Sequence, residues 1–223
     1  MVVGGRTFMR NILNLMTNLK EQHHYTRISA AAKADIAWWQ RGLKLFHGIA
    51  PFTCDIPVPN FHFSTDACLL GGGAIFLKDW CYMNWEIDYP ELVGVHINEL
   101  ELKTVLVAAE RWGPLWKGKH VRVFSDNTAT VSALNKGTSR GKGLLEICQR
   151  LFWCSVEHGF RLTAVHLPGK LNVASDKISR LHELSIAIEA KSLLFNDCVV
   201  VECVKHMSHE TFLHLQECWM KDC

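Results

Sequence analysis

The chain has 223 residues, of which 48% are hydrophobic, and it carries a formal net charge of +2 at pH 7. This length suits one medium domain with an appendage, or two small domains. The composition excludes a disordered, collagen-like or disulfide-framework protein, and the small net charge identifies no partner. Nine irregularly spaced cysteines, no secretory signal and no apolar run near the roughly 20 residues that span a bilayer predict an intracellular protein with free thiols and no membrane partner.

The first part of the chain predicts two helices. Apolar residues recur at helical spacing over residues 6–19 and again over residues 29–46. Three prolines between residues 48 and 60 end the helical pattern and indicate a linker. We therefore expect four parts, namely a helical segment, a linker, an α/β domain and a tail, with approximate bounds 1–50, 51–60, 61–182 and 183–223.

The third part alternates between strand and helix patterns. Strand patterns cover 61–67, 71–77, 81–86, 120–126 and 160–166. Helical patterns cover 96–112, 127–135, 143–157 and 172–181. This order predicts an α/β domain with a five-stranded mixed sheet flanked by helices. The tail is weakly helical, with one β-prone run at 198–204.

Glu101 lies in an apolar stripe of the helix predicted at 96–112. Because side chains advance by about 100° per residue, Glu101 shares a face with Val105, and this face should contact the sheet. Glu99 and Lys103 fall on a different, polar face. A buried glutamate indicates either a functional site or a paired structural charge.

Three aspartates lie near the ends of other predicted elements. Asp66 is close to the end of the first strand, Asp126 ends the fourth strand, and Asp176 is one turn into the last helix. Taken singly, Asp66 also suits a turn, Asp126 a helix N-cap, and Asp176 the favourable field of a helix N-terminus. Together with Glu101 they can converge at one edge of the sheet. Clustered carboxylates repel one another, and hard divalent cations relieve that repulsion.

The segments around these carboxylates resemble the type 1 ribonuclease H family. LELKTVLVAAE at 100–110 is similar to the glutamate helix of that family, and VFSDN at 123–127 is similar to its second catalytic strand. His166, Asn172 and Asp176, with gaps of six and four, resemble its C-terminal signature.

These sequence segments are most similar to the ribonuclease H domains of retrotransposon polyproteins, in particular those of the tyrosine-recombinase (DIRS) group. Residues 1–50 resemble the thumb or connection region of a reverse transcriptase, and no polymerase catalytic motif of the Tyr/Phe-x-Asp-Asp kind is present in the sequence. The resemblance therefore implies a piece of a longer polyprotein, with the missing reverse transcriptase portion as a partner.

The resemblance implies a metal-dependent endonuclease that hydrolyses the RNA strand of an RNA/DNA hybrid. Four carboxylates would be catalytic and would ligate two Mg²⁺ or Mn²⁺ ions: Asp66, Glu101, Asp126 and Asp176. His166 would assist proton movement or product release. Contacts to the hybrid are expected from six polar or basic residues: Ser64, Asn127, Lys136, Arg140, Lys142 and Asn172. Because no additional basic helix is evident, we expect weak activity from the isolated chain.

Two other interpretations remain open. A DNA nuclease of the integrase or resolvase type would share the fold superfamily, and a catalytically inactive remnant or interaction module would keep the fold without the chemistry.

Residues 117–150 carry seven basic residues against two acidic ones, which suits a bound polyanion or simply a solvated face. A zinc site in the tail is a further alternative, drawn from seven residues: Cys198, Cys203, His206, His209, His214, Cys218 and Cys223.

Overall fold

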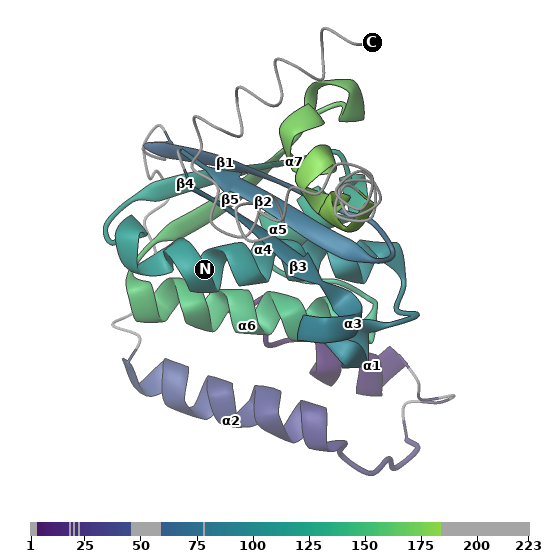
Figure 1. The fold of residues 1–223 in the computed structure, drawn as a ribbon. Coiled ribbons are helices and arrows are strands. Elements are labelled where there is room, and N and C mark those ends of the chain that lie inside the picture. Colours follow the sequence, from purple (N-terminus) through teal and green to yellow (C-terminus); the bar gives the residue numbers. More distant parts are fainter. Residues whose placement is uncertain are drawn as a thin grey trace, which may run out of the picture.

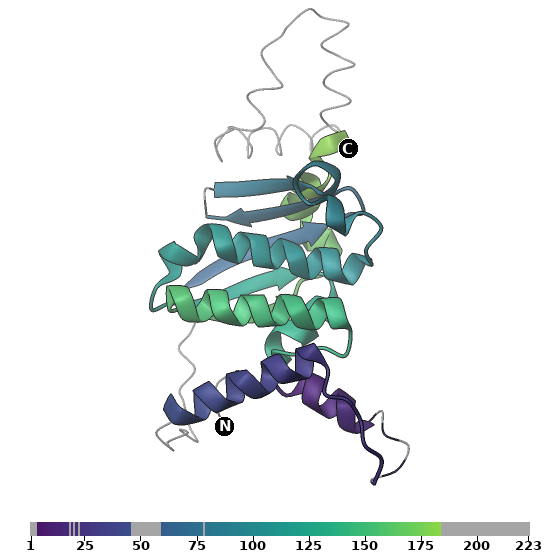
Figure 2. The same cartoon turned by 90° about the horizontal axis from the view of Figure 1, so that it is seen from below.

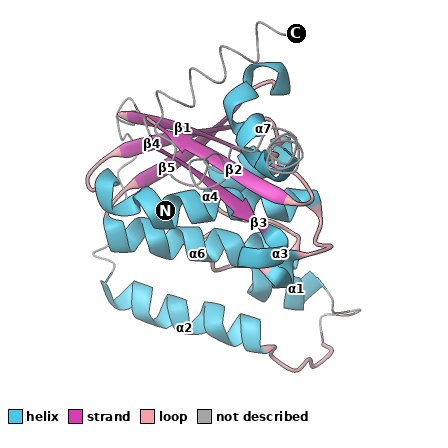
Figure 3. Ribbon diagram, viewed as in Figure 1, coloured by secondary structure: helices cyan, strands magenta, loops and turns pink. Residues whose placement is uncertain are grey.

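A five-stranded mixed sheet forms the centre of the molecule in the computed structural model, which describes residues 4–17, 19, 21, 23–45, 59–77 and 79–183 (Figure 1). The sheet order is β3-β2-β1-β4-β5. The strands are β1 (Phe61–Ala67), β2 (Gly71–Phe76), β3 (Asp79–Asn84), β4 (His120–Ser125) and β5 (Arg161–His166), drawn in magenta in Figure 3. This confirms the expected α/β class and the five-stranded mixed sheet.

The strand directions decide where the ends of the strands lie. β1, β2 and β3 form an antiparallel meander, whereas β4 runs parallel to β1 and β5 runs parallel to β4. Ser64 of β1 is in register with Phe124 of β4. The carboxyl ends of these two strands therefore lie at the same edge of the sheet, where Asp66 and Asp126 were expected to converge.

Helices cover both faces of the sheet (Figures 1 and 2). α4 (Ile97–Trp112), α5 (Thr128–Lys136) and α6 (Lys142–His158) lie on one face, and α7 (Val173–Ser179) lies on the other. Four short helices complete the domain: α3 (Trp85–Asp88), η1 (Pro90–Leu92), η2 (Gly113–Trp116) and η3 (Gly169–Leu171). The main core lies between the sheet and α4 and α6, and it is built from apolar side chains such as Leu106, Trp112, Trp116, Val121 and Val123.

The N-terminal helices pack on the outer side of α6 (Figure 2). These are α1 (Arg10–Thr17) and α2 (Ala30–Leu45). Phe8, which precedes α1, stacks on Trp38 with ring centroids 4.5 Å apart and meets Phe152 of α6 edge-on at 5.3 Å. The indole N–H of Trp39 donates to the Phe8 carbonyl oxygen at 2.9 Å. The two helices are thus joined to the sheet domain through an aromatic cluster.

Three details differ from the sequence-based expectation. α1 begins at Arg10 and not at residue 6. β3 ends at Asn84, because the Asn84 side chain accepts from the amides of Glu86 and Ile87 and so starts a helix where a strand was predicted. Lys103 was placed on a polar face but is buried, with Nζ 4.3 Å from the centroid of the Tyr89 ring. The segment before α4 covers this side of the helix, which periodicity alone did not reveal.

Several expectations fall outside the described residues. They concern most of the predicted linker at 51–60 and the tail from residue 184 onward, including its β-prone run and its possible zinc ligands. Within the described part, four cysteines have free thiols: Cys68, Cys81, Cys148 and Cys154. Among the helices described there, none has the length and apolar character needed to cross a membrane.

Candidate metal centre

Three of the four predicted carboxylates meet at one edge of the sheet. Asp66 comes from β1, Glu101 from the first turns of α4, and Asp126 from the residue directly after β4. Each offers a carboxylate oxygen, and the three oxygens lie within 4.8 Å of one another. Residues 35 and 60 positions apart in the chain are therefore brought together by the parallel pairing of β1 with β4 and by the packing of α4 on the sheet.

Asp66 is a buried strand residue and not a turn residue. It pairs with Gly73 across the β1–β2 ladder, and only 5% of its surface is exposed. Ser179 Oγ donates to Asp66 Oδ2 at 2.6 Å. Burial raises the pKa of Asp66 to about 6, the Ser179 hydrogen bond opposes this, and the neighbouring charges of Asp126 and then Asp176 add to it.

Glu101 is the most deeply buried member of the cluster. Its side chain faces the sheet as predicted, whereas Glu99 is partly exposed and does not join the cluster. Glu101 Oε2 is shielded from solvent and has no hydrogen-bond partner among the residues that the structure describes. Burial raises the pKa of Glu101 to about 9, with further increases from Asp66 and Asp126 and a small opposing effect from the Ala67 amide. In the described part of the chain, no positive charge compensates an ionised carboxylate in this position.

Asp126 does not cap α5. The N-cap is Asn127, whose side-chain oxygen accepts from the Thr130 amide at 3.0 Å. The Asp126 carboxylate thus has no capping role and is free to belong to the cluster. His166, the last residue of β5, lies beside it, with Nε2 3.1 Å from the Asp126 carbonyl oxygen.

Glycines in β2 let α7 approach the sheet closely. A Cβ on Gly73 would lie 2.5 Å from the Ser179 amide nitrogen, so a larger residue there would push α7 away. The buried Asn172 side chain donates from Nδ2 to the Thr65 carbonyl oxygen at 2.9 Å, and the Ser64 and Ser175 hydroxyls are 2.6 Å apart. Ser64 and Asn172, predicted as substrate contacts, therefore join β1 to α7 in this structure.

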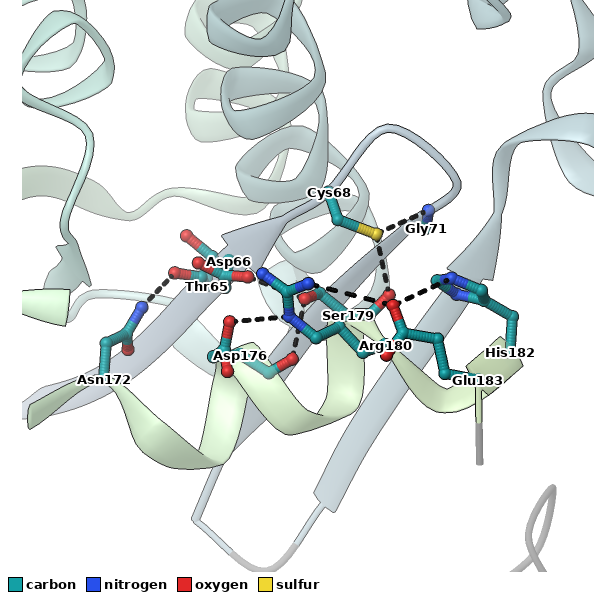
Figure 4. Close-up of polar contacts among 10 residues, drawn as sticks. All are labelled: Thr65, Asp66, Cys68, Gly71, Asn172, Asp176, Ser179, Arg180, His182 and Glu183. Carbon is teal, nitrogen blue, oxygen red and sulfur yellow. Dashed lines mark hydrogen bonds and ion pairs between the residues drawn. The ribbon is translucent and has the colours of Figure 1, made fainter. Parts of the chain in front are cut away.

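Asp176, the fourth predicted carboxylate, lies on the same side of the sheet as Asp66 but outside the group of three (Figure 4). Its Oδ1 accepts from Arg180 Nε at 3.0 Å, one helical turn further along. Its charge still acts on Asp66, since it raises the pKa of that carboxyl. The structure thus brings together three predicted ligands and places the fourth beside them in an ion pair.

The remaining predicted contacts lie near the surface. Lys136, Arg140 and Lys142 are exposed around the connection between α5 and α6. The Asn127 Nδ2 group donates to Asn98 Oδ1 at 2.9 Å, which ties the start of α5 to the first turn of α4.

Three residues of this site were not found from the sequence: Asn98, Ser179 and Arg180. Asn98 lies three residues before Glu101, so helical spacing alone could have indicated that both side chains share a face. Ser179 and Arg180 follow Asp176 by three and four residues, which is the same signal, but their relation to Asp66 depends on tertiary contacts between α7 and β1.

The donor set fits a divalent cation. Every ligand atom of the cluster is a carboxylate oxygen, as Mg²⁺ and Mn²⁺ prefer. The unpartnered Glu101 Oε2 and the mutual repulsion of the three carboxylates are both relieved by a cation among them. No protein-family model matches the chain, and no curated protein matches it significantly.

Proposed function

We propose that the chain is a metal-dependent nuclease of the ribonuclease H type, which hydrolyses the RNA strand of an RNA/DNA hybrid. The order of the strands and the position of the carboxylates on them are compatible with a ribonuclease H-like fold. The resemblance of the carboxylate-bearing segments adds the substrate class and the origin in a retroelement polyprotein. The observation that carries the proposal is the convergence of Asp66, Glu101 and Asp126 within 4.8 Å, with a buried oxygen of Glu101 left unpartnered.

Asp66, Glu101 and Asp126 would hold the metal ions, and Asp176 would contribute once released from Arg180. When bound, a pair of such ions supplies an activated water and stabilises the leaving 3′ oxygen, so that the products carry 5′-phosphate and 3′-hydroxyl ends. The protein supplies the rigid frame. Asp66 is fixed by Ser179, and Glu101 is fixed by the packing of α4 on the sheet.

His166 is suited to moving a proton at the edge of this cluster. Its ring is exposed to solvent, and Nε2 lies 3.1 Å from the Asp126 carbonyl oxygen. An imidazole in this position can exchange protons with water near the scissile phosphate. The exposed bases Lys136, Arg140 and Lys142 would contact the phosphates of the hybrid without reading its sequence.

The test is cleavage of an RNA/DNA hybrid whose RNA strand is end-labelled, in the presence of Mn²⁺. We expect cuts within the RNA strand, and loss of about 100-fold or more of the rate in Glu101→Gln and Asp126→Asn. Glu99→Gln is the matched control, because it removes the same charge from the same helix outside the cluster. Its rate should stay within about twofold of the unaltered chain.

Equal cleavage by the unaltered chain and by Asp126→Asn would contradict the proposal. Two parallel substrates separate the other interpretations. Cleavage of duplex DNA with the hybrid left intact would favour a DNA nuclease, and no cleavage of either substrate at any Mn²⁺ concentration would favour an inactive remnant.

A further inference from the structure

The last residue of α7 and its C-cap carry two side chains that act on Asp66 from the face opposite α4 (Figure 4). Ser179 is fully buried and donates its hydroxyl to Asp66 Oδ2 at 2.6 Å. Arg180 follows at the end of the helix, and its positive charge favours the ionised form of Asp66. One residue thus fixes the orientation of Asp66, and the next supplies a cation close to it.

Arg180 stands among three carboxylates. Its Nε lies 3.0 Å from Asp176 Oδ1, its Nη1 lies 3.8 Å from Glu183 Oε1, and in Figure 4 its guanidinium projects toward the space between Asp66 and Asp176. Asp176 is engaged with Arg180 and lies outside the three-carboxylate group. The guanidinium neutralises the Asp66–Asp176 side of the site, as a metal ion there would.

A guanidinium and a divalent cation compete for such a position. Both are attracted to the same carboxylate oxygens, and each repels the other. The Arg180–Asp176 pair is about half-exposed, and exposed pairs four residues apart on a helix are weak. Arg180 can therefore be displaced at little cost, which frees Asp176.

We propose that Arg180 is an internal counter-cation that holds Asp176 back until a second divalent ion displaces it. The first ion would bind at Asp66, Glu101 and Asp126 without Asp176. The second ion would need Asp176, and so must displace Arg180. The inference rests on the proposed metal-dependent function of the same carboxylates. It makes Arg180 a positioning residue that sets the metal concentration at which the fourth carboxylate is recruited.

Calorimetric titration of the intact chain with Mn²⁺ tests this without any activity measurement. In Arg180→Ala we expect the second binding event to tighten about tenfold, because one positive charge near a doubly charged ion is removed. The first event should change by less than about threefold. Arg180→Lys keeps the charge and should resemble the unaltered chain. Arg161→Ala removes an exposed arginine from the opposite end of β5 and controls for net charge.

The double variant Arg180→Ala with Asp176→Asn isolates the pair. If Arg180 acts through Asp176, removing Arg180 should not tighten the second Mn²⁺ binding event once Asp176 is neutral. An unchanged or weaker second event in Arg180→Ala, with the first event intact, overturns this inference and leaves the metal site standing. Absence of any Mn²⁺ binding in the unaltered chain overturns both this inference and the proposed function. Arg180→Gln serves in place of Arg180→Ala if the latter does not fold.

Discussion

Asp35 and Glu101 are both almost completely buried carboxylates, yet their surroundings differ. Asp35, on α2, is 1% exposed and accepts three hydrogen bonds, from the Asn11 amide, the Asn11 side chain and the Gln149 side chain, at 3.1–3.2 Å. Glu101 is 4% exposed, has an unpartnered oxygen and lies against two other carboxylates. The first arrangement joins α1, α2 and α6. The second opposes the ionisation of Glu101, because burial and the two neighbouring carboxylates raise its pKa.

The difference distinguishes a carboxylate whose burial is compensated by hydrogen bonds from one whose burial is not. Burying a charged group is costly unless donors or a counter-ion compensate for it. Neutral donors from neighbouring helices meet this requirement at Asp35 within the chain itself. At Glu101 the described residues provide little beyond the Ala67 amide, which is why we propose that a cation supplies the compensation. The proposed cation site at the carboxylate cluster is therefore supported by the burial and contacts of Glu101 as well as by the family resemblance.

The largest stability effect is expected at the structural carboxylate. Asp35→Ala should lower the free energy of unfolding by about 3 kcal/mol, because three donors in the contact between α1, α2 and α6 lose their acceptor. Urea denaturation measures this directly. Glu86→Ala, at an exposed carboxylate, is the control and should change stability by less than about 0.5 kcal/mol. Equal stability of Asp35→Ala and the unaltered chain would show that the hydrogen bonds of Asp35 do not stabilise the fold.

Glu101→Gln should stabilise the metal-free protein, whereas Asp35→Ala destabilises it. At pH 8 it replaces a carboxyl whose ionisation is opposed by burial and by Asp66 and Asp126 with a neutral amide of similar shape. We expect the thermal midpoint in EDTA to rise by about 2–4 °C, equivalent to about 1 kcal/mol for a chain of this size. Asp35→Asn is the matched neutralisation at the other buried carboxylate, and it should lower the thermal midpoint. A decrease in both variants would show that Glu101 is structurally compensated after all.

The pH dependence of stability should reflect the same two carboxyls. The pKa of Glu101 is raised from 4.5 to about 9, and that of Asp66 from 3.8 to about 6, so the folded state retains protons that the unfolded state has released. Their contribution to stability is therefore present in full below about pH 4 and is lost progressively as the pH rises toward 9. The slope from Glu101 is at most about 1.4 kcal/mol per pH unit.

Differential scanning calorimetry at a series of pH values in EDTA checks this prediction. Excess Mn²⁺ should flatten the decline, since a bound cation favours the ionised carboxylates. Glu101→Gln should flatten it above pH 6 without any metal. A stability that stays constant from pH 5 to pH 9 in EDTA would argue against the raised pKa of Glu101.

Much of the fold was predictable because its elements are regular. β1 was expected at 61–67 and occurs there, and α4 and β4 differ from their predicted bounds by one residue. Helical phase alone predicts that Glu101, and not Glu99, faces the sheet, and the burial of these two residues agrees with that prediction. Periodicity suffices for Glu101 because its apolar stripe faces the sheet, even though other sides of α4 are buried as well.

The remaining features depend on contacts between distant segments. Lys103 was misplaced because the segment around Tyr89 covers a second side of α4. The capping alternative for Asp126 could not be rejected from the sequence, since Asn127 beside it is an equally good N-cap and only the structure shows which one accepts the hydrogen bond. The roles of Ser179, Arg180 and Asp35 depend on how α7 and α2 dock, which local patterns do not encode.

We propose that the carboxylate cluster, and not the hydrogen-bonded Asp35, binds a divalent cation. Titration of the metal-free chain with Mn²⁺ at pH 7.5, followed by electron paramagnetic resonance of the free ion, tests it most directly. We predict saturable binding that is reduced about 100-fold or more by Glu101→Gln and left unchanged by Asp35→Asn under conditions where both variants are folded. Binding that is equally strong in the unaltered chain and in Glu101→Gln, or no binding at millimolar Mn²⁺, would contradict it.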